Sequence, residues 1–130
     1  MIRTFEKQAC KIFNGLRKTA SGKGAVGTEV RVAGEVLFVK FATDYSVLER
    51  RLFRAVQSSP DSERAYFDAV KADMTGYVDK KLSEIFPGLK STNIILNVSL
   101  HDDLSFATII LNENIEKKIL SGEVSLPSKV

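Results

Sequence analysis

The length, composition and charge of the chain predict one globular domain. The chain has 130 residues, of which 44% are hydrophobic and 27% are charged, and its formal net charge is +3. This balance is typical of a domain with one hydrophobic core, and it argues against a disordered chain and against a histone-like basic tail. The single cysteine, Cys10, excludes an internal disulfide, and its place on a predicted helix indicates a partly buried, unreactive thiol.

The first residues of the chain bear on its location. Residues 1–8 contain no unbroken apolar run, so we expect neither a signal peptide nor a transmembrane span. The sequence therefore predicts a cytoplasmic protein with no direct membrane insertion. Any position at the periphery of a membrane would then depend on a partner protein.

The first part of the chain predicts a helix followed by a β-hairpin. Apolar side chains recur at helical spacing over residues 2–19, and the glycines within residues 22–27 end this helix. Alternation of apolar and polar side chains predicts strands over residues 29–33 and 36–41. Residues 33–35, Ala-Gly-Glu, predict a tight turn between them.

The middle of the chain predicts two helices. Ser46 and Glu49 fit a capping box at the start of a short helix. The apolar side chains of this helix are Val47, Leu48, Leu52, Ala55 and Val56. A long helix follows from about residue 63 to residue 86, with Asp61 or Ser62 as its cap and Pro87-Gly88 as its end.

The last part predicts a second hairpin and a closing helix. Strands are predicted over residues 92–101 and 104–111, with a turn at Asp102-Asp103, and a helix over about residues 113–121. The resulting order, α-β-β-α-α-β-β-α, predicts an α+β fold. Its four-stranded antiparallel sheet would come from two β-hairpins, with the helices packed on one face. We expect a single domain over residues 1–123 and a flexible tail over residues 124–130.

The glycine-rich segment resembles part of a phosphate-binding loop. Gly22-Lys23-Gly24 lacks the full eight-residue spacing of that loop and follows a helix instead of a strand, which argues against a nucleotide site. Two interpretations stay open. The segment is either an anion-binding turn, in which free amides and Lys23 hold a carboxylate or carbonate, or a plain linker.

The single histidine is the other candidate for chemistry. His101 precedes Asp102 and Asp103, but neighbouring strand residues point in opposite directions, so we expect no metal site. The chain has no Gly-x-Ser-x-Gly nucleophile elbow, and we assign no catalytic residue. His101 fits either a residue at the mouth of a hairpin or a titratable ligand contact.

Several short motifs, taken in order, resemble a known family. Gly22-Lys23-Gly24 is followed by the strands Glu29-Val30-Arg31-Val32 and Val36-Leu37-Phe38-Val39. Ser46-x-x-Glu49-x-x-Leu52, the long helix and Val98-Ser99-Leu100-His101-x-Asp103 come next. Over residues 10–112 this order resembles the MpsC or YbcI-like family of small bacterial proteins. The chain departs from that pattern at Ala25, where members usually carry proline, and at Lys71, where they usually carry arginine.

The resemblance implies an accessory role. The family has no recognised catalytic motif and is associated with a membrane-potential-generating, cation-coupled system that serves inorganic-carbon uptake. Our first hypothesis is therefore a non-enzymatic accessory or sensor domain that binds a small anion, such as bicarbonate, formate or another carboxylate. The candidate contacts are Gly22, Lys23, Gly24, Arg31, Lys71 and His101, because a small carboxylate requires positive charge and directed donors.

Other partners and activities follow from the same residues. We expect a homodimer, because an exposed sheet edge or face in a small domain is commonly paired, and we expect no cofactor. One alternative is a small acid–base enzyme that uses His101 and Asp103. A second is a basic nucleic-acid-binding domain, which the sequence disfavours because no aromatic platform accompanies the basic pairs on the predicted helices.

Overall fold

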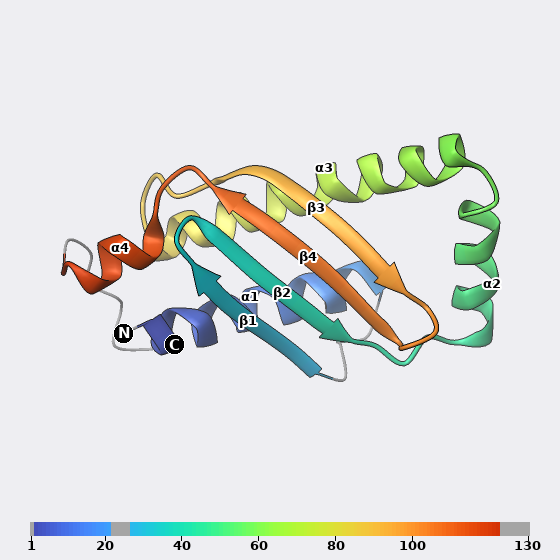
Figure 1. Cartoon of the computed structure of the whole chain (residues 1–130), viewed down its shortest axis with the longest axis horizontal. Coiled ribbons are helices and arrows are strands. Elements are labelled where there is room, and N and C mark those ends of the chain that lie inside the picture. Colours follow the sequence, from blue (N-terminus) through green and yellow to red (C-terminus); the bar gives the residue numbers. More distant parts are fainter. Residues whose placement is uncertain (1, 22–26, 123–130) are drawn as a thin grey trace.

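The computed structural model describes residues 2–21 and 27–122, and it confirms the predicted α+β class and element order (Figure 1). The elements are α1 (Ile2–Ser21), β1 (Gly27–Ala33), β2 (Val36–Ala42), α2 (Val47–Val56), α3 (Pro60–Ile85), β3 (Ser91–Ser99), β4 (Leu104–Leu111) and α4 (Ile115–Leu120). The predicted tail over residues 124–130 and the segment with Gly22, Lys23 and Gly24 lie outside the described residues.

The four strands form one antiparallel sheet in the order β1-β2-β4-β3. Each predicted hairpin therefore supplies two neighbouring strands. In the first hairpin Ala33 pairs with Val36, which leaves Gly34 and Glu35 as a two-residue turn. Gly34 has a φ of 61°, a left-handed conformation that glycine adopts without a steric penalty. The predicted turn is confirmed.

The strand side chains alternate between a covered face and an open face of the sheet. In Figure 1, α1 and α3 lie behind the sheet and cover one face. The core between them includes Phe5, Phe13, Leu37, Val39, Val78, Leu82 and Ile109. Among the residues that the structure describes, no element covers the opposite face, which we call the helix-free face. Its side chains include Glu29, Arg31, Phe38, Lys40, Ile95, Asn97, Phe106 and Thr108.

Side chains of α1 also bond to the outer edge of β1. The Glu6 carboxylate accepts a hydrogen bond from the Val32 N–H at 2.9 Å, and Cys10 Sγ donates to the Thr28 carbonyl at 3.1 Å. Burial, and after it the charge of Glu29, raise the pKa of the Cys10 thiol. The protonated thiol is a poor nucleophile, so these contacts support the predicted unreactive cysteine.

The long helix begins earlier than the sequence indicated. The Ser59 hydroxyl accepts a hydrogen bond from the Ser62 N–H at 3.1 Å, and Pro60 is the first helical residue. The expected cap at Asp61 or Ser62 is therefore wrong, because proline at the first position fixes the helix start one residue after the capping serine. The buried side chains of α3 are Met74, Val78 and Leu82, so residues 60–73 add no fully buried side chain to the core.

The last hairpin differs from the prediction at its tip. β3 ends at Ser99 and residues 100–103 form the turn, so the expected strand end at His101 is wrong. Asp103 takes a positive φ of 54°, which a short polar side chain tolerates in a tight turn. His101 is an exposed turn residue. β4 spans the predicted residues, and α4 starts at Ile115 with Asn114 as its N-cap, later than expected.

Candidate functional site

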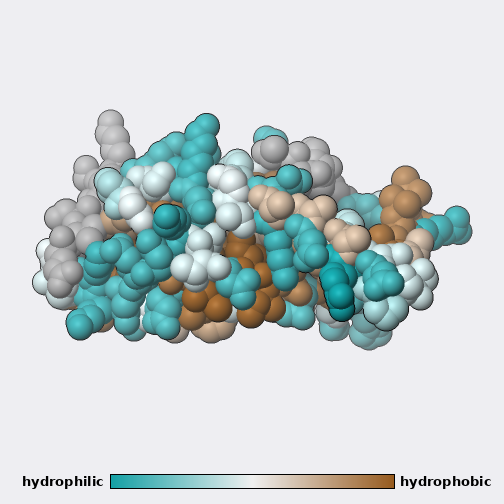
Figure 2. Space-filling model, turned by 90° about the horizontal axis from the view of Figure 1, so that it is seen from above, coloured by the Kyte–Doolittle hydropathy of each residue, from teal (hydrophilic) through white to brown (hydrophobic). Residues whose placement is uncertain are grey.

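Helix α2 is well capped but lies outside the core. Ser46 Oγ accepts from the Glu49 N–H at 3.1 Å, and Glu49 Oε1 accepts from the Ser46 N–H at 3.0 Å, which confirms the predicted capping box. All residues of α2 are described and none of them is buried. Val47, Leu48 and Leu52 are 69%, 66% and 59% exposed. Figure 2 shows hydrophobic side chains at this end of the molecule.

Arg50 ties α2 to the turn between β3 and β4. Its Nη1 donates to the Leu100 carbonyl at 2.7 Å, and its Nη2 pairs with the Asp103 carboxylate. A longer contact of 3.4 Å joins Arg50 Nε to the Tyr45 carbonyl. Asp103, which the acid–base alternative pairs with His101, is thus engaged in positioning α2.

Three aromatic rings join α2 to the start of α3. The Phe53 ring lies edge-to-face with Tyr66 and Phe67, at centroid separations of 5.7 and 6.0 Å. The Tyr66 and Phe67 rings are 5.5 Å apart. Edge-to-face rings attract one another beyond the effect of burial, so this cluster holds the two helices together. We call α2 together with residues 60–73 of α3 the helical hairpin.

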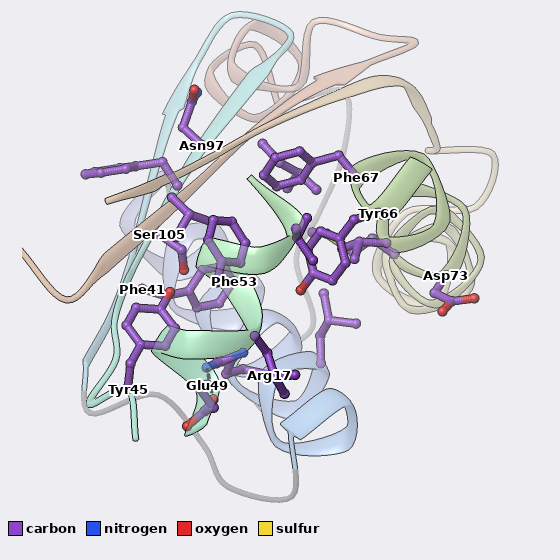
Figure 3. Close-up of a pocket in the computed structure, with 18 residues that line it drawn as sticks. Arg17, Phe41, Tyr45, Glu49, Phe53, Tyr66, Phe67, Asp73, Asn97 and Ser105 are labelled. Carbon is purple, nitrogen blue, oxygen red and sulfur yellow. Dashed lines mark ion pairs between the residues drawn. The ribbon is translucent and has the colours of Figure 1, made fainter. Parts of the chain in front are cut away.

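A cavity of about 500 Å³ lies between the helical hairpin, the end of α1 and the covered face of the sheet (Figure 3). We call it the hairpin cavity. Its apolar lining includes Leu16 of α1, Phe41 of β2, Val98 of β3, Phe53 and Val56 of α2, and Phe67 and Val70 of α3. Sites for small organic molecules have volumes of roughly 300–1,000 Å³ and walls of this composition.

The charged side chains among the described lining residues are Arg17, Glu49 and Asp73. Arg17 Nη2 is 3.8 Å from Glu49 Oε2, and the Arg17 guanidinium is 5.8 Å from the centroid of the Tyr45 ring. Figure 3 shows Asp73 directed away from the other lining side chains. One cation beside one carboxylate gives no net charge, so the hairpin cavity favours an uncharged molecule over a free anion.

The described members of the predicted anion site lie on different elements and outside the hairpin cavity. Arg31 is on β1 at the helix-free face, where its Nη1 donates to the Val30 carbonyl at 3.0 Å. Lys71 is on α3, and His101 is in the exposed turn after β3. None of these three residues lines the cavity. Gly22, Lys23 and Gly24 lie outside the described residues, so the anion site stays a prediction.

Sequence reasoning missed the residues of the hairpin cavity. Glu49, Phe53 and Val56 recur at helical spacing and mark the face of α2 that lines it, and Tyr45 lies just before the helix. The apolar residues named for this helix left out Phe53 and included Val47, which does not line the cavity. The helical spacing of Glu49, Phe53 and Val56 could have indicated this face. The part of the cavity wall that α1 and the sheet form depends on tertiary packing.

Two further properties concern the described residues as a set. Within residues 2–21 and 27–122, no group of three His, Cys, Asp or Glu side chains is placed to hold a metal ion. Over the same ranges, no helix is both long and apolar enough to cross a membrane.

The fold and the site define a four-stranded α+β domain with a mainly apolar cavity beneath a helical hairpin. Comparisons of the chain with protein-family models, with curated proteins and with solved structures find no match. The resemblance to the MpsC or YbcI-like family stays a prediction from the sequence motifs.

Proposed function

We propose that this chain is a non-enzymatic sensor or accessory domain that binds a mainly apolar, uncharged small molecule in the hairpin cavity. The observation that supports this proposal most strongly is the volume of about 500 Å³ with apolar walls from three helices and the sheet. Displacing water from such walls is favourable, by roughly 25 cal/mol for each Å² of apolar surface buried. The polar groups at the cavity, among them the hydroxyls of Tyr45, Tyr66 and Ser105, would orient the ligand.

The helical hairpin suits a sensor because ligand contacts and exposed surface meet on α2. Leu52 lines the hairpin cavity and is also largely exposed, and Leu48 lies one turn before it on the same helix. A ligand that packs against Phe53 and Val56 would favour one position of α2 over others. The same helix would then offer Val47 and Leu48 to a partner protein in a ligand-dependent way.

Two parts of the sequence-based hypothesis remain as predictions beside this proposal. The first is a small anion, bicarbonate or formate, held by residues such as Arg31, Lys71 and His101. The second is a cytoplasmic role beside a membrane cation and inorganic-carbon transport system, which depends on the family resemblance. Neither prediction depends on a ligand in the hairpin cavity. Evidence against either prediction would therefore leave the proposed cavity site unchanged.

Titration with the uncharged fluorescent dye N-phenyl-1-naphthylamine tests the proposal. At roughly 0.3 kcal/mol of binding free energy for each heavy atom, a Kd at or below about 200 µM is expected. Val56→Trp, which adds an indole to the cavity wall, should weaken dye binding by about tenfold or more. Val47→Trp, on the same helix but not in the wall, should leave the Kd within about twofold of the wild-type value.

Two outcomes would contradict the proposal: no dye binding by the folded protein, or equal binding by both tryptophan variants. Thermal unfolding in the presence of bicarbonate or formate tests the anion prediction separately. A ligand of the folded state raises the Tm by mass action. A rise that Arg31→Ala or His101→Ala removes would support a small-anion site outside the hairpin cavity.

A further inference from the structure

The helix-free face exposes a contiguous apolar patch. Phe38, Ile95 and Phe106 are 49%, 43% and 37% exposed and lie on three neighbouring strands, β2, β3 and β4. The register places both Phe38 and Ile95 directly opposite Thr108, and it places Lys40 opposite Phe106. Neighbouring exposed apolar side chains at the centre of an uncovered sheet are a feature of interaction surfaces.

The edges of the sheet are less suited to pairing than its face. On β1, the outward Val32 N–H and Thr28 carbonyl are bonded to side chains of α1 at 2.9 and 3.1 Å. On β3, the Ile94 N–H is bonded to the Asn93 side chain at 2.9 Å. A strand added at either edge would have to displace these contacts, which protects the edges from pairing.

The charges on β1 and β2 make the helix-free face complementary to itself. Its register forms two adjacent rows, Glu29, Lys40, Phe106 and Asn97 in the first, and Arg31, Phe38, Thr108 and Ile95 in the second. Two copies can face each other across a two-fold axis that lies parallel to the sheet, runs between the two rows and is perpendicular to the strands. This axis places the first row of one copy on the second row of the other copy. Glu29 then meets Arg31 of the second copy, and Lys40 meets the ring of Phe38 of the second copy.

The face is large enough for a specific contact. Four strands about 4.8 Å apart, with seven residues that each rise about 3.3 Å, cover roughly 450 Å² in projection. Counted on both copies this is roughly 900 Å² in projection, close to the lower limit of about 1,000 Å² for a specific interface. We infer that the chain forms a homodimer through the helix-free face. Phe38 and Phe106 pack at its centre, and two Glu29–Arg31 pairs lie along β1. This inference does not depend on the ligand of the hairpin cavity.

Sedimentation of the full chain by analytical ultracentrifugation tests the dimer. The wild-type protein should sediment as a dimer. Phe38→Asp should raise the dissociation constant by about a hundredfold or more, because central aromatic residues dominate interface energies. Leu120→Asp changes an apolar side chain on α4 that is 70% exposed, and it should leave the constant within about twofold.

Charge reversal tests the register of the two copies. Glu29→Arg and Arg31→Glu each place like charges across the interface and should raise the dissociation constant by about tenfold. The double variant restores the pairs and should return the constant to within about threefold of the wild-type value. Circular dichroism of each variant separates loss of the dimer from loss of the fold. A wild-type monomer at about 200 µM, a Phe38→Asp dimer as stable as wild type, or a double variant no tighter than the single ones would overturn the inference.

Discussion

The Ser46–Glu49 pair stabilises the start of α2, a helix that has no buried side chain. Ser46→Ala removes the acceptor of the Glu49 N–H and should destabilise α2 by about 1 kcal/mol. Local opening of α2 would increase by about fivefold, and amide hydrogen exchange would report it. Exchange in α1 and in the central strands should stay unchanged.

Ser83→Ala is the matched control for this change. The Ser83 hydroxyl bonds to the Lys80 carbonyl on the exposed side of α3, far along the chain from the α2 cap. Its loss should leave exchange in α2 unaffected. Equal exchange of α2 in the wild-type and Ser46→Ala proteins would show that contacts other than the cap maintain the helix.

Cys10 should titrate at a higher pH in the folded protein than in the unfolded chain. Burial and the charge of Glu29 raise its pKa, so the folded state favours the protonated thiol. The resulting stability is present below the unfolded pKa and is lost as the pH rises through the folded pKa. The pH profile of alkylation by iodoacetamide, measured with and without urea, checks the direction. A folded midpoint at or below the unfolded one would refute it.

Some single residues could be assigned from the sequence and others could not. The capping box at Ser46 was predictable because it depends only on the local spacing of Ser46 and Glu49 in the sequence. The cap of α3 was misassigned because several polar residues compete there, and the fixed φ of Pro60 selects Ser59. Arg17 gave no signal of its own, since it joins the hairpin cavity only when the fold brings the end of α1 near Glu49 of α2.

At the scale of elements, the helical hairpin and the core should respond differently to loss of a phenylalanine. Phe13→Ala removes a fully buried ring that contacts Phe41, and it should destabilise the fold by about 3–5 kcal/mol. Phe53→Ala removes a half-buried ring from the helical hairpin, and its cost should be about 1–2 kcal/mol. Urea unfolding followed by circular dichroism measures both costs.

The same pair of variants distinguishes stability from binding. Phe53→Ala should weaken N-phenyl-1-naphthylamine binding although its fold persists, because Phe53 is part of the cavity wall. An equal loss of unfolding free energy in both variants would mean that the helical hairpin belongs to the core. That result would remove the basis for treating α2 as a separately responsive element.

The strands were predictable as elements because alternation is a local signal, and both hairpins keep the expected pairing. The environment of α3 was not predictable from the sequence. Its apolar stripe runs on at helical spacing from Phe67 to Leu82, yet only Met74, Val78 and Leu82 are buried. The earlier part of the stripe, including Phe67 and Val70, lines the hairpin cavity. Residues of one apolar stripe therefore lie in two environments, the core and the wall of the hairpin cavity. The helical periodicity of the sequence does not distinguish them.

In the whole molecule, the two candidate surfaces lie on opposite faces of one sheet, and Asn97 and Phe106 of the helix-free face also border the hairpin cavity. Phe41 and Val98 face the hairpin cavity, whereas Phe38 and Ile95 belong to the helix-free face of the same strands, β2 and β3. The fold class was predictable because local hairpins and helices leave few ways to cover one sheet. The cavity and the proposed dimer depend on how distant segments meet.

The most direct test of a ligand site in the hairpin cavity is a map of backbone amide chemical shifts as N-phenyl-1-naphthylamine is added to isotope-labelled protein. We expect the changes to be confined to the end of α1 near Leu16 and Arg17, to Tyr45 and α2, to residues 60–74 of α3, and to the strand residues near Phe41 and Val98. Changes centred on Arg31, Lys71 or His101, changes across the helix-free face, or no changes at saturating dye would contradict the proposed site.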